Sequence, residues 1–333
     1  MSSEVSPGAP AGAGTGAAGT GAAGRPPLRS LLFVPGTRTD WLPGARAAGA
    51  DAAILDLEDA VPAAHRLSAR AAVSEAVARA AAAPADQADR MALFVRVNPL
   101  DGWAEAEELR AVVRPGLTGV VLPKVRSARD VRLADRLLGW CEREQGLPPG
   151  QVALVPLLET ARALREAYDI ARAAPRIAYL GALTAPGGDV ERAVGYRWSP
   201  EGTETTALRS RVLLDVRAAG VPCPVGGVWT RVGDLPGLRA FAEQNRSLGY
   251  EGMMAIHPSH VPVINEVFSP GPAELARCTE LIAAVEAAQR DGRGAVTFRG
   301  EMVDEAMAVT ARLVLARHAA RDWGARTGGD RPG

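Results

Sequence analysis

The sequence has little of four things that would direct a protein toward particular partners: cysteine, aromatic side chains, net charge and long apolar runs. Its three cysteines are far apart and odd in number among 333 residues, which excludes a disulfide framework or metal knuckle and fits a reducing cytoplasm. Lys+Arg and Asp+Glu number 38 each, so no net charge attracts nucleic acid or an anionic membrane. Aromatic residues make up only 5% of the chain, and no apolar run reaches the roughly 18 residues of a membrane-spanning helix.

Two common motifs and one residue type are also scarce. No Gly-x-Gly-x-x-Gly turn joins a predicted strand to a helix, and Gly187-Gly188 alone is weak evidence for a nucleotide site. No Gly-x-Ser-x-Gly elbow supports serine hydrolase chemistry. Lys124 is the only lysine in a chain whose other basic residues are almost all arginine. A lysine that served only as surface charge would be freely replaced, so Lys124 is a candidate functional residue.

Eight short apolar runs alternate with helical patterns along the centre of the chain. The runs are nearly continuous, which is typical of parallel strands covered on both faces. The predicted strands are Ser30–Pro35, Ala52–Leu57, Ala92–Val97, Gly119–Pro123, Val152–Leu158, Arg176–Leu180, Pro224–Trp229 and Gly252–Ile256. The helical patterns between them include Ser68–Ala82, Ala128–Glu144, Ala161–Ala173, Thr205–Ala219 and Leu235–Leu248. Eight such units predict an α/β fold, the (β/α)8 TIM barrel, with an open doubly wound sheet as the alternative.

The ends of the chain depart from this repeating pattern. Residues 1–26 are almost all small, so we expect them to be disordered, and they lack the basic start and apolar centre of a secretory signal. Residues 27–270 form the predicted barrel. Residues 271–322 lie beyond a complete barrel and hold two helical patterns around the segment GAVTFRGEMVD, so they form a C-terminal helical extension. Residues 323–333 are predicted to be a loose tail.

Charged residues follow or interrupt the apolar runs at the same end of successive strands. In a barrel, the carboxyl ends of the strands carry the chemistry. Any one of these residues could be a solvated rim residue, but six in the same position along successive units predict a functional site. They are Glu58 in the segment DLED, Arg96 in FVRVN, Lys124 in VLPK, Glu159 in VPLLET, Asp189 after the sixth strand and His257 after the eighth.

Two of these carboxylates suit a divalent metal ion. Glu159 and Asp189 are candidate ligands for Mg²⁺, which takes one or two protein carboxylates and fills its other positions with water and substrate oxygens. His257 precedes a proline without a His/Cys cluster, so we interpret it as a turn or packing residue rather than a zinc ligand. Lys124 raises a rival chemistry, a metal-free aldolase that forms a Schiff base, with which a Glu/Asp metal site would be redundant.

Six segments, in order, carry a family resemblance: RSLLFVPGTR, AAILDLEDAVP, LFVRVNP, GVVLPKV, PLLET and AIHPSHVPVINEVFSP. In their order and spacing they make the chain resemble the HpcH/HpaI aldolase and citrate lyase β-subunit-like family over residues 28–310. Within that family, the sequence is most similar to acyl-CoA ester lyases of the malyl-CoA, β-methylmalyl-CoA and citramalyl-CoA type.

The resemblance implies a Claisen reaction that depends on Mg²⁺, with Mn²⁺ as an alternative. A 3-hydroxyacyl-CoA with a distal carboxylate is cleaved to an acyl-CoA and a 2-oxo acid such as glyoxylate, or formed from them. Glu159 and Asp189 are the implied metal ligands, and the metal would act as a Lewis acid on the 2-oxo acid. Arg96 is the implied residue at the reacting carbonyl, where it would stabilise the enolate oxygen. We count Glu58 and Lys124 among the catalytic residues as well.

The segment GEMVD resembles the lid of CoA lyases, which supplies an aspartate base and commonly reaches the site of a neighbouring subunit. Asp304 would then move the proton on the acyl α-carbon, although aspartate is also a favoured helix N-cap. This implies a homo-oligomer, a trimer or a hexamer. Citrate lyase β-subunits, which act on a carrier-bound substrate, are typically shorter and lack this lid, so the lid favours a free CoA thioester.

Two details of the resemblance differ or are less specific. After strand six the chain has GALTAPGGDVERAVG where common relatives have a shorter motif, which leaves Glu191 as the alternative to Asp189 as second metal ligand. Other residues stand where relatives contact CoA, and an arginine among them could pair with a phosphate. The implied CoA contacts are Phe33, Pro35, Arg38 and Pro270.

Three other functions stay open. A citrate-lyase-like subunit would work with an acyl-carrier partner, and a free-acid aldolase would turn over without CoA. A catalytically silent barrel would serve as a binding or scaffold protein. The presence of Arg96, Glu159 and Asp304 argues against the silent barrel, which has no physical need for all three.

Overall fold

The structure is a computed structural model that describes residues 24–82 and 91–326. The strands of its main sheet are β1 (Ser30–Pro35), β2 (Ala52–Asp56), β3 (Ala92–Arg96), β4 (Gly119–Leu122), β5 (Ala153–Pro156), β6 (Tyr179–Leu180), β7 (Cys223–Gly226) and β8 (Gly252–Ala255). They run in the order β5-β4-β3-β2-β1-β8-β7-β6, every pair is parallel, and the bridges Leu154–Ile177 and Leu158–Ala182 join the two edges. The predicted (β/α)8 TIM barrel is therefore confirmed, and the open sheet is excluded.

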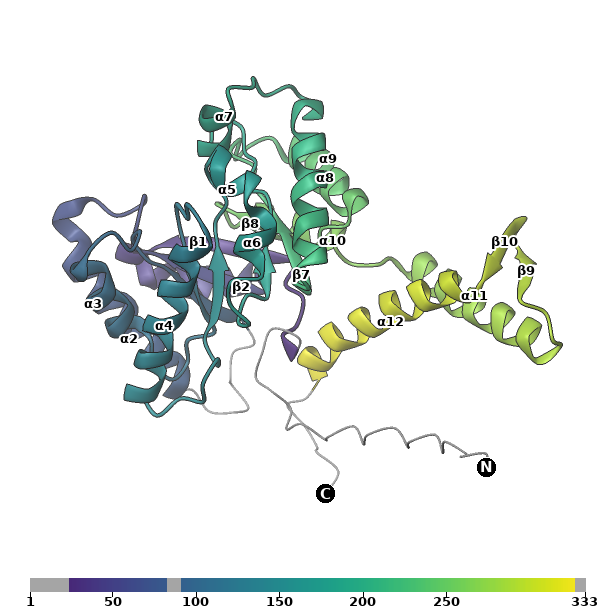
Figure 1. Ribbon diagram of the computed structural model, residues 1–333, viewed down its shortest axis with the longest axis horizontal. Coiled ribbons are helices and arrows are strands. Elements are labelled where there is room, and N and C mark those ends of the chain that lie inside the picture. The colour runs from purple at the N-terminus through teal and green to yellow at the C-terminus, as the bar shows by residue number, and fades with distance from the viewer. Residues whose placement is uncertain (1–23, 83–90, 327–333) are drawn as a thin grey trace, which may run out of the picture.

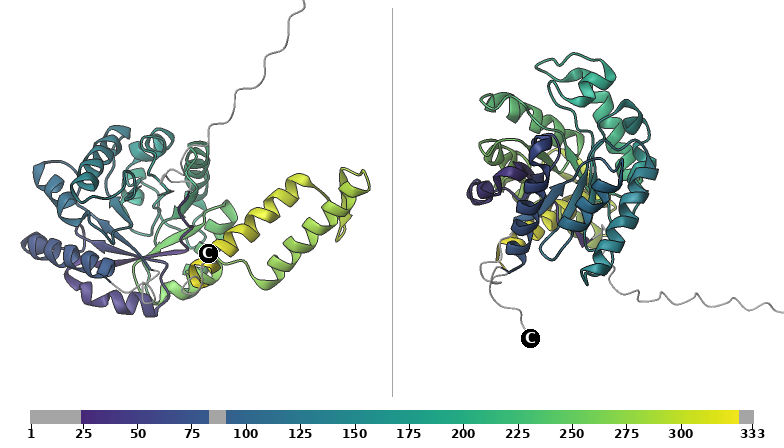
Figure 2. Two further views of the ribbon diagram at one scale, coloured as in Figure 1. Left: turned by 90° about the horizontal axis from the view of Figure 1, so that it is seen from below. Right: turned by 90° about the vertical axis from the view of Figure 1, so that its left-hand side faces the viewer.

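Helices surround the sheet (Figures 1 and 2). Two short 3₁₀ helices are η2 (Gly36–Trp41) and η3 (Ala63–His65). The helices of the barrel region are α1 (Leu42–Ala47), α2 (Arg66–Ala82), α3 (Trp103–Val112), α4 (Ala128–Glu144), α5 (Ala161–Arg165), α6 (Ala167–Ala171), α7 (Asp189–Val194), α8 (Thr203–Ala218), α9 (Leu235–Leu248) and α10 (His260–Val267).

Both faces of the strands are buried, as their unbroken apolar sequences require. Alternate side chains of β1 to β5 fill the barrel interior, and the intervening ones pack against the helices. Interior residues include Leu31, Ile54, Phe94, Val121 and Val155. Residues facing the helices include Leu32, Leu55, Val95, Val120 and Leu154. The two layers hold the strand ends rigidly, which fixes the rim where the charged residues lie.

The barrel helices follow the sequence pattern with one difference. α4 and α9 span their predicted ranges, and each begins at a side-chain cap: Ser127 accepts the N–H of Arg129, and Asp234 accepts that of Gly237. The single helix predicted over Ala161–Ala173 is instead divided into α5 and α6. The division falls at Glu166, whose φ of −96° and ψ of 18° lie outside the helical region.

A C-terminal arm, residues 272–326, projects away from the barrel (Figures 1 and 2). It consists of α11 (Pro272–Arg290), the antiparallel strands β9 (Ala295–Phe298) and β10 (Glu301–Asp304), and α12 (Glu305–Arg326). The hairpin turns at Arg299 and Gly300, whose φ angles of 51° and 87° match a two-residue turn. Its own small core contains Leu281, Val285, Val303, Ala308 and Ala311. The extension predicted beyond the barrel is thus a helical hairpin with a β-hairpin at its tip.

The structure changes the predicted limits of the two tails. Arg25 donates to the carbonyl of Gly150 at 3.2 Å, and the hydroxyl of Tyr179 donates to the carbonyl of Pro26 at 2.7 Å. These two residues, predicted to be disordered, are fixed at the amino-terminal end of the barrel. α12 extends to Arg326 and includes the start of the predicted C-terminal tail. The rest of both tails lies outside the described residues. No helix in the described part of the chain is long and apolar enough to cross a bilayer.

Candidate active site

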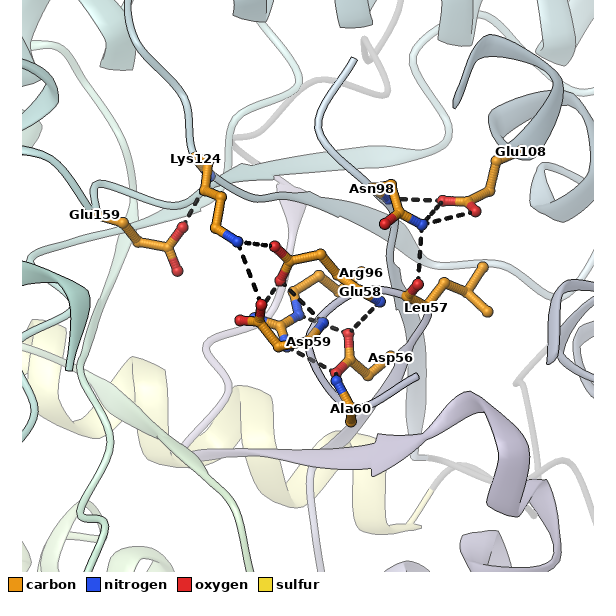
Figure 3. Close-up of polar contacts among 10 residues, drawn as sticks. All are labelled: Asp56, Leu57, Glu58, Asp59, Ala60, Arg96, Asn98, Glu108, Lys124 and Glu159. Carbon is orange, nitrogen blue, oxygen red and sulfur yellow. Dashed lines mark hydrogen bonds and ion pairs between the residues drawn. The ribbon is translucent and has the colours of Figure 1, made fainter. Parts of the chain in front are cut away.

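Charged side chains from four consecutive strands meet at one mouth of the barrel (Figure 3). Asp56 and Arg96 end β2 and β3 and are register partners in the parallel ladder. Lys124 lies two residues beyond β4, and Glu159 lies three residues beyond β5. Because parallel strands of a barrel all end on one rim, residues far apart in sequence become neighbours there.

Arg96 is held in one orientation by carboxylates of the β2 end. Its Nε and Nη2 each lie 2.7 Å from an oxygen of Asp56, a bidentate pair, and its Nη1 lies 3.1 Å from Glu58 and 3.4 Å from Asp59. The guanidinium also lies over the ring of Phe33, 4.9 Å from its centroid. Burial alone would lower the pKa of Arg96, but the hydrogen bonds of Asp56 and the negative charges of Asp56, Glu58 and Asp59 together outweigh burial and raise it. The group is therefore a fixed, permanently charged donor.

Lys124 connects the carboxylates of the β2 end to Glu159. Its backbone has a left-handed φ of 51°, and its N–H donates to Oε2 of Glu159 at 2.8 Å. Its Nζ forms ion pairs with Glu58 and, at 3.3 Å, with Asp59. The hydrogen bond with Glu58 raises the pKa of the Lys124 ammonium. A lysine that forms a Schiff base needs a lowered pKa, so this environment opposes the metal-free aldolase.

Glu159 is a partly buried carboxylate without a cationic partner among the described residues. It accepts a hydrogen bond from the backbone N–H of Lys124. Burial raises the pKa of Glu159 to about 7, and the negative charges of Glu58 and Asp189 act in the same direction. A cation bound next to this carboxylate would stabilise its charged form.

Asp189 begins α7 directly after a tight turn. The N–H of Gly188 donates to the carbonyl of Ala185 at 3.2 Å, and Gly187 between them has a φ of 71°, which a type II turn needs and glycine adopts without strain. The Asp189 carboxylate forms an ion pair with Arg192, one turn along the same helix.

Glu191, the alternative ligand, points back into its own loop. Its Oε2 accepts the N–H of Gly187 at 2.6 Å, and its Oε1 accepts that of Trp198 at 3.4 Å. It lines neither cavity described below, whereas Asp189 lines both. The geometry therefore favours Asp189 over Glu191 as the partner of Glu159.

The donor set at this rim fits a hard divalent cation. Glu159 and Asp189 offer carboxylate oxygens, and in the described ranges no group of three or more His, Cys, Asp or Glu side chains is placed to hold a metal. Two protein carboxylates leave positions for water and substrate oxygens, as Mg²⁺ prefers. His257 forms a local turn instead, with Nδ1 2.8 Å from the hydroxyl of Ser259. The fit rests on Glu159, whose carboxylate lies in the cavity without an ion-pair partner among the described residues and has a raised pKa.

Two adjoining cavities open at the rim, and Glu159 and Asp189 line both. The central cavity, about 460 Å³, lies in the barrel mouth. Its polar wall contains Asp56, Asp59 and Arg96, and its apolar wall contains Phe33, Leu157, Leu183, Val228, Met254 and Ile256. The outer cavity, about 410 Å³, lies beside it, between the segments after β3 and β4 and helix α7. Its lining includes Leu100, Asp101, Leu122, Lys124, Val125, Arg126, Asp130, Leu133, Arg192 and Ala193.

The predicted CoA contacts of the first loop lie at the central cavity or near it. Phe33 and Pro35 line the cavity. Arg38 is exposed three residues further on, where it pairs with Asp40 at 2.9 Å and stacks on the ring of Trp41 at 4.2 Å. Its guanidinium is thus already engaged within the loop.

Two predicted residues are not brought to this site. Pro270 follows Ser269, whose hydroxyl accepts a hydrogen bond from Arg29 at 3.0 Å, and Arg29 precedes β1 at the opposite end of the barrel. Pro270 lines neither cavity of its own chain, because the link to α11 leaves from the amino-terminal side of the strands. Asp304 lies on the arm, where its Oδ1 accepts the N–H of Met307 at 3.3 Å as a helix cap.

The structure also changes which acid of the DLED segment faces the cavity. Asp56 and Asp59 line the central cavity, whereas Glu58, the acid we selected, is buried between Arg96 and Lys124. The missed signal was the strand register, since Asp56 and Arg96 both end five-residue strands that pair.

A second buried carboxylate supports the rim from outside. Glu108 on α3 accepts the backbone N–H of Asn98 at 2.7 Å, and the amide of Asn98 donates to the carbonyl of Leu57 at 2.9 Å (Figure 3). Burial raises the pKa of Glu108. This contact ties the end of β3 to the end of β2, and the sequence carries no local signal for it because it depends on how α3 packs.

The fold and the rim together define a TIM barrel whose mouth combines a fixed arginine with two carboxylates, Glu159 and Asp189, that line the same cavities. The model of the HpcH/HpaI aldolase/citrate lyase family matches residues 29–258. The chain belongs to this family, and the prediction of a carbon–carbon lyase is confirmed at the family level.

Curated relatives and solved structures agree with this assignment. The chain is 37% identical to a citrate lyase subunit beta-like protein of Deinococcus radiodurans, over 88% of this chain and 98% of the relative. It is 35% identical to a (3S)-malyl-CoA thioesterase of Cereibacter sphaeroides, over 87% of this chain and 94% of the relative. The CitE protein of Mycobacterium tuberculosis, solved with magnesium, acetoacetate and coenzyme A, superposes with a TM-score of 0.65 at 28% identity, over 88% of this chain and 98% of that one.

Proposed function

We propose that this protein is a Mg²⁺-dependent CoA ester lyase. It reversibly cleaves a 3-hydroxyacyl-CoA with a distal carboxylate, such as malyl-CoA, β-methylmalyl-CoA or citramalyl-CoA, to an acyl-CoA and a 2-oxo acid. The observation that carries the proposal is that Arg96, Glu159 and Asp189 line one cavity. It places a fixed cationic donor opposite a carboxylate pair suited to a metal ion.

Arg96 performs the electrostatic part of the reaction. Asp56 fixes the orientation of its guanidinium, so an N–H that is not bonded to Asp56 can donate to the thioester oxygen as negative charge develops there, without reorganising at that moment. Glu159 and Asp189 would hold Mg²⁺, which supplies Lewis-acid polarisation of the 2-oxo acid when bound. Glu58 and Lys124 act through their neighbours, since Glu58 orients Arg96 and the Lys124 backbone orients Glu159.

Asp304 is the base in this proposal, and it acts in the site of a neighbouring subunit. Its hairpin lies on the outer part of an arm that projects from its own barrel (Figure 1). The arm exposes apolar side chains that a partner surface would cover: Met302, Met307, Val309 and Leu313. The working unit is then a homo-oligomer, a trimer or a hexamer.

A citrate-lyase-like subunit is the second candidate, because the length argument against it fails. The citrate lyase subunit beta of Escherichia coli matches at 32% identity over 289 residues, 87% of this chain and 92% of the relative. That match is longer than the predicted barrel, residues 27–270, so it is not confined to the barrel. The presence of the arm therefore does not distinguish a free CoA substrate from a carrier-bound one.

The test is a product analysis that separates three chemistries. Purified protein with Mg²⁺ is incubated with malyl-CoA, β-methylmalyl-CoA or citramalyl-CoA, and both the 2-oxo acid and the free CoA thiol are measured. A lyase releases the 2-oxo acid and keeps the thioester, whereas a thioesterase releases free CoA. Turnover of a citryl-carrier thioester but of no CoA ester would favour the citrate lyase subunit. Absence of 2-oxo acid from every substrate would contradict the lyase.

A further inference from the structure

The outer cavity is not accounted for by the groups assigned so far. It shares Glu159 and Asp189 with the central cavity but has none of the residues that hold Arg96. In the proposed reaction, the thioester reaches the central cavity, where Arg96 and the first-loop residue Phe33 lie. The outer cavity is then left for the part of the 2-oxo acid that extends from the shared carboxylates on the other side.

The surface that lines the outer cavity is more apolar than polar, and four aliphatic side chains contribute to it. Leu100 follows β3, Leu122 ends β4, Val125 lies in the next loop and Leu133 lies on α4. About 410 Å³ is within the size range of small-ligand sites. An aliphatic chain placed there would leave water for an apolar surface, which is favourable for every methylene buried.

The charges that line this cavity are already matched by neighbours. Lys124 pairs with Glu58 and Asp59. Arg126 pairs with Asp101 at 3.1 Å and with Asp130 at 3.3 Å. A second carboxylate on the substrate would therefore compete with acids already present.

Arg192 is the remaining cation of the lining, and it pairs with Asp189. The three cations that line the outer cavity thus all have acidic partners, and Glu159 adds a further negative charge. This balance favours an uncharged chain over an anionic one.

We propose that the outer cavity receives an uncharged aliphatic chain of the 2-oxo acid, longer than the methyl group of pyruvate. The protein then also joins an acyl-CoA to straight-chain 2-oxo acids of four to six carbons, or cleaves the corresponding 3-hydroxyacyl-CoA to these two products. This inference rests on the proposed function, because it assumes that a 2-oxo acid binds at Glu159 and Asp189.

The test measures binding without turnover. Dissociation constants are determined by calorimetry for glyoxylate, pyruvate, 2-oxobutyrate, 2-oxopentanoate and 2-oxohexanoate, with the full chain, Mg²⁺ and no acyl-CoA. We expect affinity to rise about three- to fourfold for each methylene beyond pyruvate. The five-carbon acid 2-oxoglutarate should bind more weakly than 2-oxopentanoate, because its second carboxylate meets the acids of the lining.

A matched pair of variants locates the chain-length effect. Ala193 and Val194 are adjacent exposed residues of α7, but only Ala193 lines the outer cavity. Ala193→Trp should fill the cavity and remove the gain for 2-oxohexanoate, with pyruvate affinity within about twofold of wild type. Val194→Trp places the same side chain outside both cavities and should keep the gain.

Each outcome separates this inference from the proposed function. If pyruvate and glyoxylate do not bind with Mg²⁺, the proposed function and the inference both fail. If pyruvate binds but longer acids bind no better in the wild type, or the gain survives Ala193→Trp, only the inference fails. Tighter binding of 2-oxoglutarate than of 2-oxopentanoate overturns the uncharged chain. Displacement of 2-oxohexanoate, but not of pyruvate, by free CoA would assign the outer cavity to the cofactor and overturn the inference.

Discussion

The barrel mouth and the C-terminal arm hold their acidic residues in opposite ways. At the mouth, Asp56 is only 2% exposed and uses both oxygens on Arg96. On the arm, Asp304 is exposed and accepts one hydrogen bond, from the helix that follows it. The carboxylates of the mouth are therefore held by contacts within one chain, whereas the carboxylate of Asp304 is exposed on the arm.

The apolar residues of the two regions show the same contrast. Strands of the barrel bury side chains on both faces, and β2 is buried at all five positions. On the arm, Met302 is 77% exposed and Leu313 is 52% exposed. A region that leaves such side chains in water gains free energy when another surface covers them. The comparison teaches that the barrel mouth is complete in its polar contacts within one chain, whereas the arm keeps apolar side chains exposed that a partner would cover in the proposed oligomer.

Removing a carboxylate from the mouth should have the largest effect. We expect EDTA to abolish turnover and Mg²⁺ or Mn²⁺ to restore it. Glu159→Ala should lose both turnover and Mg²⁺ binding by calorimetry while circular dichroism shows an unchanged fold, because a rim carboxylate contributes little to the core. Glu191→Ala is the control and should keep Mg²⁺ binding, since Glu191 faces its own loop. Full activity in EDTA would contradict the metal site and favour the metal-free aldolase, with a Schiff base on Lys124.

Removing the arm's acid should reduce catalysis almost as much. Asp304→Asn should slow exchange of the α-protons of acetyl-CoA or propionyl-CoA about 10²–10⁴-fold, the usual contribution of a positioned base. Mass spectrometry in deuterium oxide measures this exchange. Binding of the 2-oxo acid should be unaffected, because the proposed role of Asp304 is at the acyl α-carbon and not at the 2-oxo acid.

Mixing two inactive variants tests whether the arm acts between subunits. When Arg96→Ala and Asp304→Asn chains exchange freely, about a quarter of sites pair an intact arginine with an intact aspartate if the arm acts in trans. The mixture should then recover about a quarter of the wild-type activity. Proven subunit exchange without recovery would remove the trans arm, although Asp304 could still act within its own chain.

Changing the shape of the fixed cation should cost less. Arg96→Lys keeps a positive charge but loses the planar pair of donors that matches Asp56. We expect kcat to fall about 10²–10³-fold, with a melting temperature close to that of wild type. Arg162→Lys, an exposed arginine on α5 away from both cavities, is the matched control and should be unchanged. If kcat of Arg96→Lys were within about threefold of the wild-type value, Arg96 would only line the cavity.

A smaller effect should appear in the stability of the metal-free protein. The folded-state pKa of Glu159 is about 7, above its ordinary value of 4.5, because burial disfavours the charge. Folding thus favours the protonated form, and this stabilisation is lost as pH rises from 4.5 through 7, by no more than about 3 kcal/mol. Urea unfolding in EDTA at several pH values, compared with Glu159→Gln, measures it. Identical pH slopes in the two proteins would contradict the assignment.

The smallest effect concerns the attachment of the arm. Truncation after Gly271 removes the arm with its own core. Two ion pairs with partly exposed arginines join the arm to the barrel, Arg246 with Glu274 at 2.6 Å and Arg317 with Glu251 at 2.9 Å. Such pairs contribute about 0–1 kcal/mol each, so the barrel should keep its cooperative unfolding and Mg²⁺ binding. Loss of the folded barrel would show that the arm is part of its core.

The sequence predicts the barrel well because its signals are local. Each strand is a short apolar run, so all eight appear within two or three residues of their predicted limits, and Arg96 and Glu159 lie at the rim where their strand ends place them. The split at Glu166 and the β-hairpin of the arm were missed, since a break in a helix and a turn at Arg299 depend on one or two backbone conformations.

Side-chain partnerships were harder to predict than positions. The pair Asp56–Arg96 depends on strand register, and the contact of Glu108 with Asn98 depends on the packing of α3. The outer cavity depends on three loops and on helices α4 and α7, a combination that no single motif describes. These features arise from contacts across the fold, which a pattern along the chain does not record.

The surroundings of Lys124 also protect the protein from its proposed substrate. A thioester acylates an unprotonated amine, and Lys124 carries the only side-chain amine in the chain, at the rim of the cavities. Glu58 and Asp59 form ion pairs with that amine, and the hydrogen bond with Glu58 raises its pKa, which favours the protonated form. With the proposed thioester substrate, the same two acids that contact Arg96 would therefore oppose self-acylation, and an amine-selective reagent should label Lys124 faster after Glu58 has been replaced.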